Sequence, residues 1–71
     1  MFYEVKILET AKQYRDKGMK WFESYQQNHN EAAYEMSMHN MTMADGLLEA
    51  YGILTGKLVI SAQIENELSN Y

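Results

Sequence analysis

A helical spacing of apolar and small residues near the start of the chain constrains the fold more than any other feature. These residues recur at alternating steps of four and three: Ile7, Ala11, Tyr14, Gly18, Trp21 and Tyr25. The spacing places them on one face of an α-helix, and Leu8 and Phe22 widen the stripe. It predicts a helix over residues 2–28, roughly 40 Å long at about 1.5 Å per residue.

Gly18 stands inside this stripe, where glycine costs about 1 kcal/mol of helix propensity relative to alanine. We expect Gly18 to let another helix approach closely, and a kink at this position is the alternative.

A second helix is predicted after the polar stretch Asn28-His29-Asn30. Asparagine is favoured at turns and helix caps, so Asn30 before Glu31 predicts an N-cap with a carboxylate in the first turn. The expected buried face of this helix is broad and carries Ala33, Tyr34, Met38 and Met41.

Residues 40–43 leave two alternatives for the second helix. Thr42 followed by Asp45 is close to a capping box, which would end one helix near Asn40 and begin another. Otherwise a single helix spans residues 31–55. The stripe would then continue through Ala44, Leu47, Leu48, Tyr51 and Leu54. The alanine, methionine and leucine content and the lack of proline favour the continuous helix.

The last segment is predicted as a short helix over residues 58–70. Gly56 is typical of a helix stop, and Ile60, Ile64 and Leu68 then recur at every fourth position. Residues 58–60 could instead form a strand, but the sequence offers it no partner. We therefore predict one all-α domain over residues 1–71, a bundle of three helices, or four if the second one breaks.

The small size indicates that this bundle is completed by oligomerisation, a homodimer being the simplest form. A core in a chain of 71 residues rarely supplies more than about 3–5 kcal/mol. The absence of cysteine excludes disulfides and thiolate zinc sites. The longest apolar run, residues 58–60, is far shorter than the ~20 residues of a membrane helix, and no secretion signal is recognisable. We expect a cytoplasmic protein without membrane contact.

Charge is distributed unevenly along the chain. Residues 1–20 hold five cations and three acids, whereas residues 21–71 hold one lysine and seven carboxylates. This imbalance favours either head-to-tail self-attraction or an acidic surface for a basic partner. A simple solvated polar face is the third alternative.

The stretch MSMHNMTM, residues 36–43, combines four methionines with His39. Thioethers and imidazole suit Cu(I). A helix would separate the donors, however, because Met36 and Met38 lie about 200° apart around its axis, as do Met41 and Met43. We predict no metal or other cofactor. The methionines are expected to fill an irregular core or to form an adaptable patch for a partner protein.

Catalysis is not expected, because the sequence has no cysteine nucleophile, phosphate-binding glycine loop or HExxH motif. A nucleic-acid-binding helical module is one alternative function, although Lys57 stands beside Glu65 and Glu67 where a recognition helix would need positive charge. A second alternative is an oligomeric sponge for a small anionic nucleotide. Its ligands would be Lys12, Arg15, Lys17 or Lys20.

The segments KGMKWFESYQ (residues 17–26), Tyr34-Glu35-Met36 and Ala44-Asp45 with Leu47-Leu48 resemble short all-α proteins of bacteriophages of Gram-positive bacteria. The resemblance implies an inhibitor that covers a surface of a larger host protein in the host cytoplasm, as anti-CRISPR and other anti-defence proteins do. We predict aromatic and methionine contacts and acidic steering residues. The contacts are Trp21, Tyr25, Tyr34, Met36, Met43 and Tyr51, and the acids are Glu23, Glu31, Glu35, Asp45 and Glu49.

Overall fold

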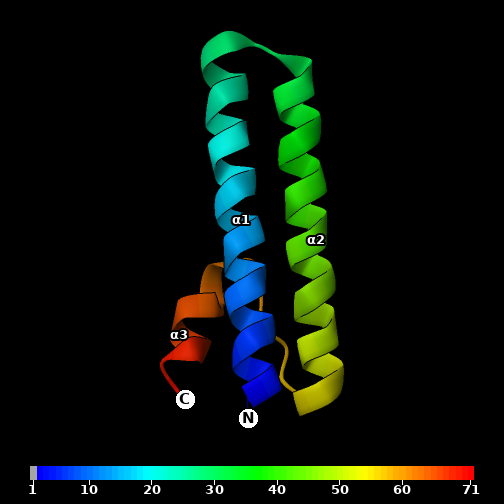
Figure 1. The fold of residues 1–71 in the computed structure, drawn as a ribbon, viewed down its shortest axis with the longest axis vertical. Helices are drawn as coiled ribbons and strands as arrows, with labels where there is room; N and C mark the ends of the chain where they lie inside the picture. Colours follow the sequence, from blue (N-terminus) through cyan, green and yellow to red (C-terminus); the bar gives the residue numbers. More distant parts are fainter. Residues whose placement is uncertain (1) are drawn as a thin grey trace.

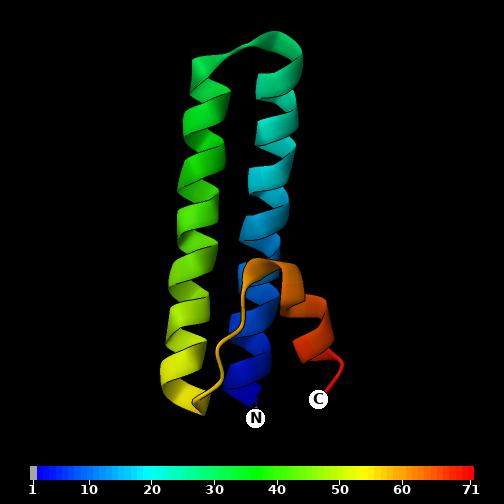
Figure 2. The ribbon, with the colours of Figure 1, turned by 180° about the vertical axis from the view of Figure 1, so that it is seen from behind.

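The computed structural model describes residues 2–71 and is all-α, as predicted. Helix α1 (Phe2–Asn28) and helix α2 (Glu31–Thr55) form a long antiparallel hairpin, and a linker leads to a 3-10 turn (Ser61–Gln63) and the short helix α3 (Ile64–Leu68). Helix α3 lies beside the first half of α1, at the end of the hairpin that holds both termini (Figures 1 and 2). The Cα atoms extend over 41 × 19 × 17 Å.

The two ends of α2 follow the predicted signals. The Asn30 side chain accepts a hydrogen bond from the Ala32 N–H at 2.9 Å, which confirms the N-cap. At the other end Gly56 has a left-handed φ of 76°, and its N–H donates to the Gly52 carbonyl at 2.7 Å. The stop predicted at Gly56 is therefore confirmed.

Helix α2 is continuous, so the alternative break near residues 40–43 does not form. Asn40 lies inside the helix, where its side chain donates to the carbonyl of Met36, one turn earlier, at 2.7 Å. The predicted capping box at Thr42 is outweighed by strong helix formers on both sides and by α1, which packs along the whole length of α2.

The last helix was predicted too long. Leu58, Val59 and Ile60 are neither helix nor strand, and the helical segment begins only at Ser61. The linker is not helical because Val59 must point into the core, where it is 6% exposed, while its neighbour Leu58 is 92% exposed. Such alternation of inward and outward side chains is typical of extended backbone.

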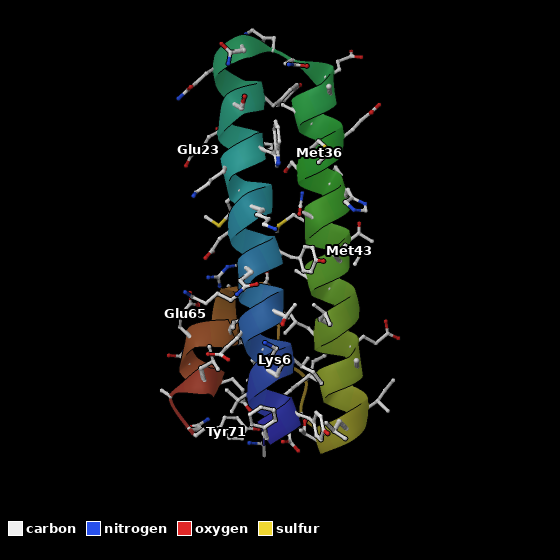
Figure 3. All side chains as sticks on the ribbon, viewed as in Figure 1. Lys6, Glu23, Met36, Met43, Glu65 and Tyr71 are labelled. Atoms are coloured by element: carbon white, nitrogen blue, oxygen red, sulfur yellow. The ribbon has the colours of Figure 1, made fainter. Side chains whose placement is uncertain are left out.

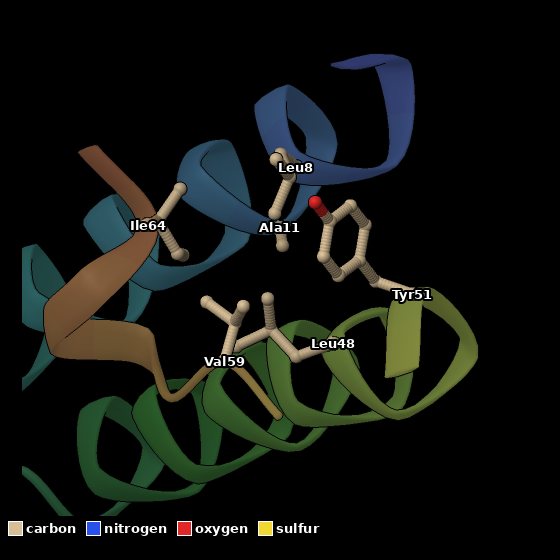
Figure 4. Close-up of a cluster of buried hydrophobic side chains, with 6 residues drawn as sticks. All are labelled: Leu8, Ala11, Leu48, Tyr51, Val59 and Ile64. Atoms are coloured by element: carbon tan, nitrogen blue, oxygen red, sulfur yellow. The ribbon is translucent and has the colours of Figure 1, made fainter. Parts of the chain in front are cut away.

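The apolar core occupies the end of the molecule where α3 joins the hairpin. It is formed by side chains from both long helices, the linker and α3 (Figure 4): Leu8, Ala11, Leu48, Tyr51, Val59 and Ile64. Tyr51, predicted as a partner contact, is 0% exposed, so this prediction is wrong. Its hydroxyl donates to Glu67 and is 2.6 Å from the Tyr71 hydroxyl, and it therefore fastens the C-terminal segment.

Away from this core, toward the tip that joins α1 to α2, the hairpin is held together by small and polar residues. The residues that α2 buries along its length are Ala33, Ser37, Asn40, Ala44, Leu48 and Tyr51. The predicted face is confirmed at Ala33, Ala44, Leu48 and Tyr51, which are buried, but not at Tyr34, Met38 and Leu54, which are 42%, 50% and 54% exposed. A β-carbon on Gly18 would lie 2.8 Å from the Met41 sulfur and 3.2 Å from the Ser37 carbonyl oxygen. Gly18 therefore permits close helix approach, as predicted, and this proximity requires small residues opposite.

Arg15 fastens α3 to α1. Its guanidinium donates to the Ser61 carbonyl at 2.6 Å and to one Glu65 oxygen at 2.9 Å, and it also contacts the second Glu65 oxygen and Asp16. The hydrogen bonds from Arg15 lower the pKa of Glu65 from 4.5 to about 2. This fork-shaped ion pair fixes the direction in which the short helix leaves the linker.

Candidate protein-binding surfaces

The hairpin is only two helices thick beyond α3. In this distal half, residues 16–28 and 31–44, helices α1 and α2 pack on each other and no third element of residues 2–71 covers them. A pair of helices buries one stripe of each partner and leaves two broad faces uncovered. Both faces of this half carry exposed apolar side chains.

One face contains an apolar groove, here called the methionine groove, of about 330 Å³. Its lining residues are Gly18, Met19, Phe22, Glu23, Ser37, Met38 and Met41. Gly18 lies on its floor under the Met41 side chain. Met19 and Met38, from opposite helices, are 54% and 50% exposed, although solvent exposure is unfavourable for side chains of this kind.

Aromatic rings continue this surface to the tip of the hairpin. The Phe22 and Tyr25 ring centroids are 6.0 Å apart, and those of Tyr25 and Tyr34 are 5.1 Å apart. Tyr25 and Tyr34 also line a shallow depression with Glu31 and Glu35. The structure thus brings the predicted contacts Tyr25 and Tyr34 together with the predicted acids Glu31 and Glu35. A third predicted acid, Glu23, lines the adjacent methionine groove.

Trp21, Met36 and Met43 lie on the opposite side of the hairpin. At about 100° per residue, Trp21 is roughly 200° around α1 from Met19, and Met36 is equally far around α2 from Met38. Figure 3 shows Met36 and Met43 facing the viewer, whereas the linker runs along the side seen in Figure 2. We call this side the open face. It comprises Tyr3, Ile7, Tyr14 and Trp21 of α1 and Met36, Met43, Leu47 and Leu54 of α2.

The remaining predicted residues do not join either group. Asp45 and Glu49 border a depression formed with Leu48 and residues 58–61, beside the linker. The sequence interpretation missed the groove itself. Its signal was present in Met19 and Phe22, which follow Gly18 by one and four positions, and in the spacing of Met38 and Met41.

The cations proposed for an anionic nucleotide are largely engaged within the chain. Arg15 binds Glu65 and Asp16, Lys12 lies 3.9 Å from Asp16, and the Lys17 ammonium lies 5.5 Å from the Tyr14 ring centroid. Among residues 2–71, no three His, Asp or Glu side chains come together as a metal site. Within the same residues no helix has both the length and the apolar character needed to cross a membrane.

A comparison with family models, curated proteins and solved structures finds no match to this chain.

Proposed function

We propose that this protein is a non-enzymatic interaction protein that binds a larger protein through the methionine groove and the aromatic tip. The observation that carries the proposal is the position of the groove. Met19, Phe22 and Met38 are exposed in the half of the molecule that lies away from the apolar core cluster. Contiguous exposed apolar surface bordered by polar residues is typical of protein-binding sites. Methionine adapts its shape to a ligand better than branched side chains do.

The chemistry of the surface favours a partner segment that is apolar on one side and basic at its edges. Glu23 lines the groove, and Glu31 and Glu35 stand beside Tyr25 and Tyr34 at the tip. Opposite charges at a rim speed up encounter and suppress wrong partners. An amphipathic helix that places its apolar stripe in the groove is the binding mode that best fits two parallel walls of side chains.

The proposed role is inhibition or regulation of a larger host machine, of the kind found in phage anti-defence proteins. It is supported by the resemblance of residues 17–26, 34–36 and 44–48 to short phage proteins and by the acidic character of α2, which contains four carboxylates and no cation. An acidic surface of this kind can occupy a groove that otherwise receives nucleic acid.

Affinity capture with matched variants tests the proposal. The wild-type chain, a Phe22→Glu/Met38→Glu variant and an Ile53→Glu control are used as bait in the same host lysate. Ile53 is 83% exposed and lies outside the groove, so the control introduces a charge on an apolar surface residue elsewhere. We expect a protein that wild type and control retain and the groove variant loses by roughly tenfold or more.

Charge reversal separates the acidic rim from the rest of the surface. Glu31→Lys/Glu35→Lys should weaken capture of the same protein, and Glu49→Lys, beside the linker, should not. Equal retention by all groove and rim variants would contradict the proposed binding site.

A further inference from the structure

The open face carries a second binding pattern that the methionine groove does not use. On each long helix its positions alternate by four and three. They are Tyr3, Ile7, Thr10, Tyr14, Lys17 and Trp21 on α1, and Met36, Asn40, Met43, Leu47, Ala50 and Leu54 on α2, of which Asn40 is already buried within the chain. This repeat is typical of helices that pack against other helices along their whole length.

Within one chain the side chains of these stripes are only partly buried. Tyr3 is 74% and Leu54 54% exposed, and Trp21, Met36 and Met43 are each about 40% exposed. Two helices of this length, side by side, present on the order of 700 Å² on one side, close to the ~800 Å² that each partner contributes to a standard protein interface. A second copy is therefore large enough to cover the face and has the same stripes.

Charge distinguishes the two ways in which a twofold axis can place one open face on another. An antiparallel arrangement would stack α1 on α1 and α2 on α2, so that the lysines along α1 would face the same lysines of the second copy. A parallel arrangement places α1 of each copy on α2 of the other.

The charges on α1 favour the parallel arrangement. Glu9 and Asp16 line a depression with Leu68 of α3, and Glu23 lines the methionine groove, so these carboxylates point away from the open face. Lys6 and Lys17 lie about 20° apart around α1. Because the Lys17 ammonium lies 5.5 Å from the Tyr14 ring centroid, this lysine edge borders the open face. In the antiparallel arrangement it would meet the lysine edge of the second copy. In the parallel arrangement it meets the open face of α2, which carries no charge because the α2 carboxylates lie at the tip and beside the linker.

We propose that two copies pack open face to open face about a twofold axis parallel to the long helices, with both hairpin tips at one end. The product is a four-helix bundle in which every neighbouring pair of helices is antiparallel. Its core is completed by Trp21, Met36 and Met43, and its two methionine grooves face outward on opposite sides.

Sedimentation and light scattering over a dilution series test the dimer itself. Wild type should sediment as a dimer, and Trp21→Glu/Met43→Glu should raise the dimer Kd by roughly a hundredfold or more, since each charge would be buried. Met19→Glu/Met38→Glu introduces the same charges in the methionine groove and should leave the dimer intact. Circular dichroism checks that each variant remains helical. A monomeric wild type at all concentrations, or equal effects of both variants, overturns the proposal.

Cysteine pairing tests the direction of packing, since the chain has no cysteine of its own. The contacts of Gly18 with Met41 and of Tyr25 with Tyr34 fix the helix register, which places Thr10 level with residues 49–50. In a parallel dimer Thr10 of one copy faces Ala50 of the other. A mixture of Thr10→Cys and Ala50→Cys should therefore form a mixed disulfide on mild oxidation.

The matched control is a mixture of Glu9→Cys and Glu49→Cys, each one residue away and turned from the open face, which should remain reduced. Disulfides in the control, or none in the test mixture while wild type is dimeric, overturn the parallel arrangement. Both groove variants, Phe22→Glu/Met38→Glu and Met19→Glu/Met38→Glu, should leave the dimer intact, so loss of partner capture and loss of dimerisation are measured separately.

Discussion

Gly18 controls how closely the two long helices approach. Its missing side chain makes room for Met41, whose sulfur lies 2.8 Å from the place of a β-carbon, and for the Ser37 carbonyl oxygen at 3.2 Å. Gly46, also inside a helix, has nothing within 4 Å of the same position. The two glycines have the same intrinsic helix penalty, so they differ only in what surrounds them.

Alanine substitutions at these two glycines should therefore change stability in opposite directions. Gly46→Ala should raise the free energy of unfolding by about 0.5–1 kcal/mol through helix propensity alone. Gly18→Ala gains the same propensity but must displace Met41 and the Ser37 backbone, and overpacking of this kind costs about 1–3 kcal/mol. We expect a net loss of roughly 1 kcal/mol at Gly18, measured by urea unfolding at equal protein concentration. Equal stabilisation by both substitutions would show that the helices can separate at no cost.

Tyr51 illustrates how one side chain can be misassigned from the sequence. Tyrosine is common in interfaces and in cores that offer its hydroxyl a partner, and the choice depends on what lies opposite. Here Glu67 and Tyr71, which are 16 and 20 residues further along the chain, supply that partner. Burial, together with the hydrogen bond to Glu67, raises the pKa of Tyr51 above its ordinary 10.0. No local pattern around Tyr51 contains this information.

Helix α3 depends on ion pairing more than the long helices do. It has only five residues, too few for a stable isolated helix, and its carboxylates Glu65 and Glu67 bind Arg15 and Lys57. The pKa of Glu65 is about 2 in the folded protein and 4.5 ordinarily. Because the folded-state pKa is the lower one, the stabilisation is complete above about 4.5 and is lost as the pH falls toward 2.

Acid should therefore release α3 in a manner that depends on Glu65. Thermal unfolding followed by circular dichroism from pH 7 to pH 2 should show a loss of stability in the wild type between about pH 4.5 and 2. Glu65→Gln should be less stable than wild type at pH 7 and should lose less on acidification. Glu49→Gln serves as control, since Glu49 forms no ion pair within residues 2–71. Parallel pH profiles for wild type and Glu65→Gln would contradict the role of this ion pair.

Helices and their ends could be predicted where the signals are local. The bounds of α1 and α2 follow from apolar spacing, from Asn30 and from Gly56, all of which act within one or two turns. The start of the last helix could not be predicted, because Val59 is drawn inward by a core built from both long helices. The separation of the methionines onto two faces was foreseen, but their assignment to the groove or the open face depends on which stripe α2 turns toward α1.

Stability is distributed unevenly along the hairpin, because the apolar core lies at one end. Near the termini, Leu8, Leu48 and Ile64 are almost fully buried. In the distal half, the residues that pack between the helices are small or polar, such as Gly18, Ala33 and Ser37. Small side chains bury little apolar area, so this half gains less from folding than the other. Its two uncovered faces are also the proposed binding surfaces.

Amide hydrogen exchange should show this gradient and its dependence on assembly. In a monomeric variant such as Trp21→Glu/Met43→Glu, the amides of residues 16–28 and 31–44 should exchange faster than those of residues 5–12 and 46–52, because local opening is easiest where few apolar side chains are buried. In the wild-type dimer, a second copy covers Trp21, Met36 and Met43, so protection should increase most in the distal half. Mass spectrometry of peptic fragments measures both. Uniform exchange along the hairpin would contradict the uneven distribution of stability. Exchange that does not change with protein concentration would contradict the covering of the open face by a second copy. A dimer stabilised in this way would present its two methionine grooves, one on each copy, as rigid surfaces, which reduces the entropy lost when a partner binds.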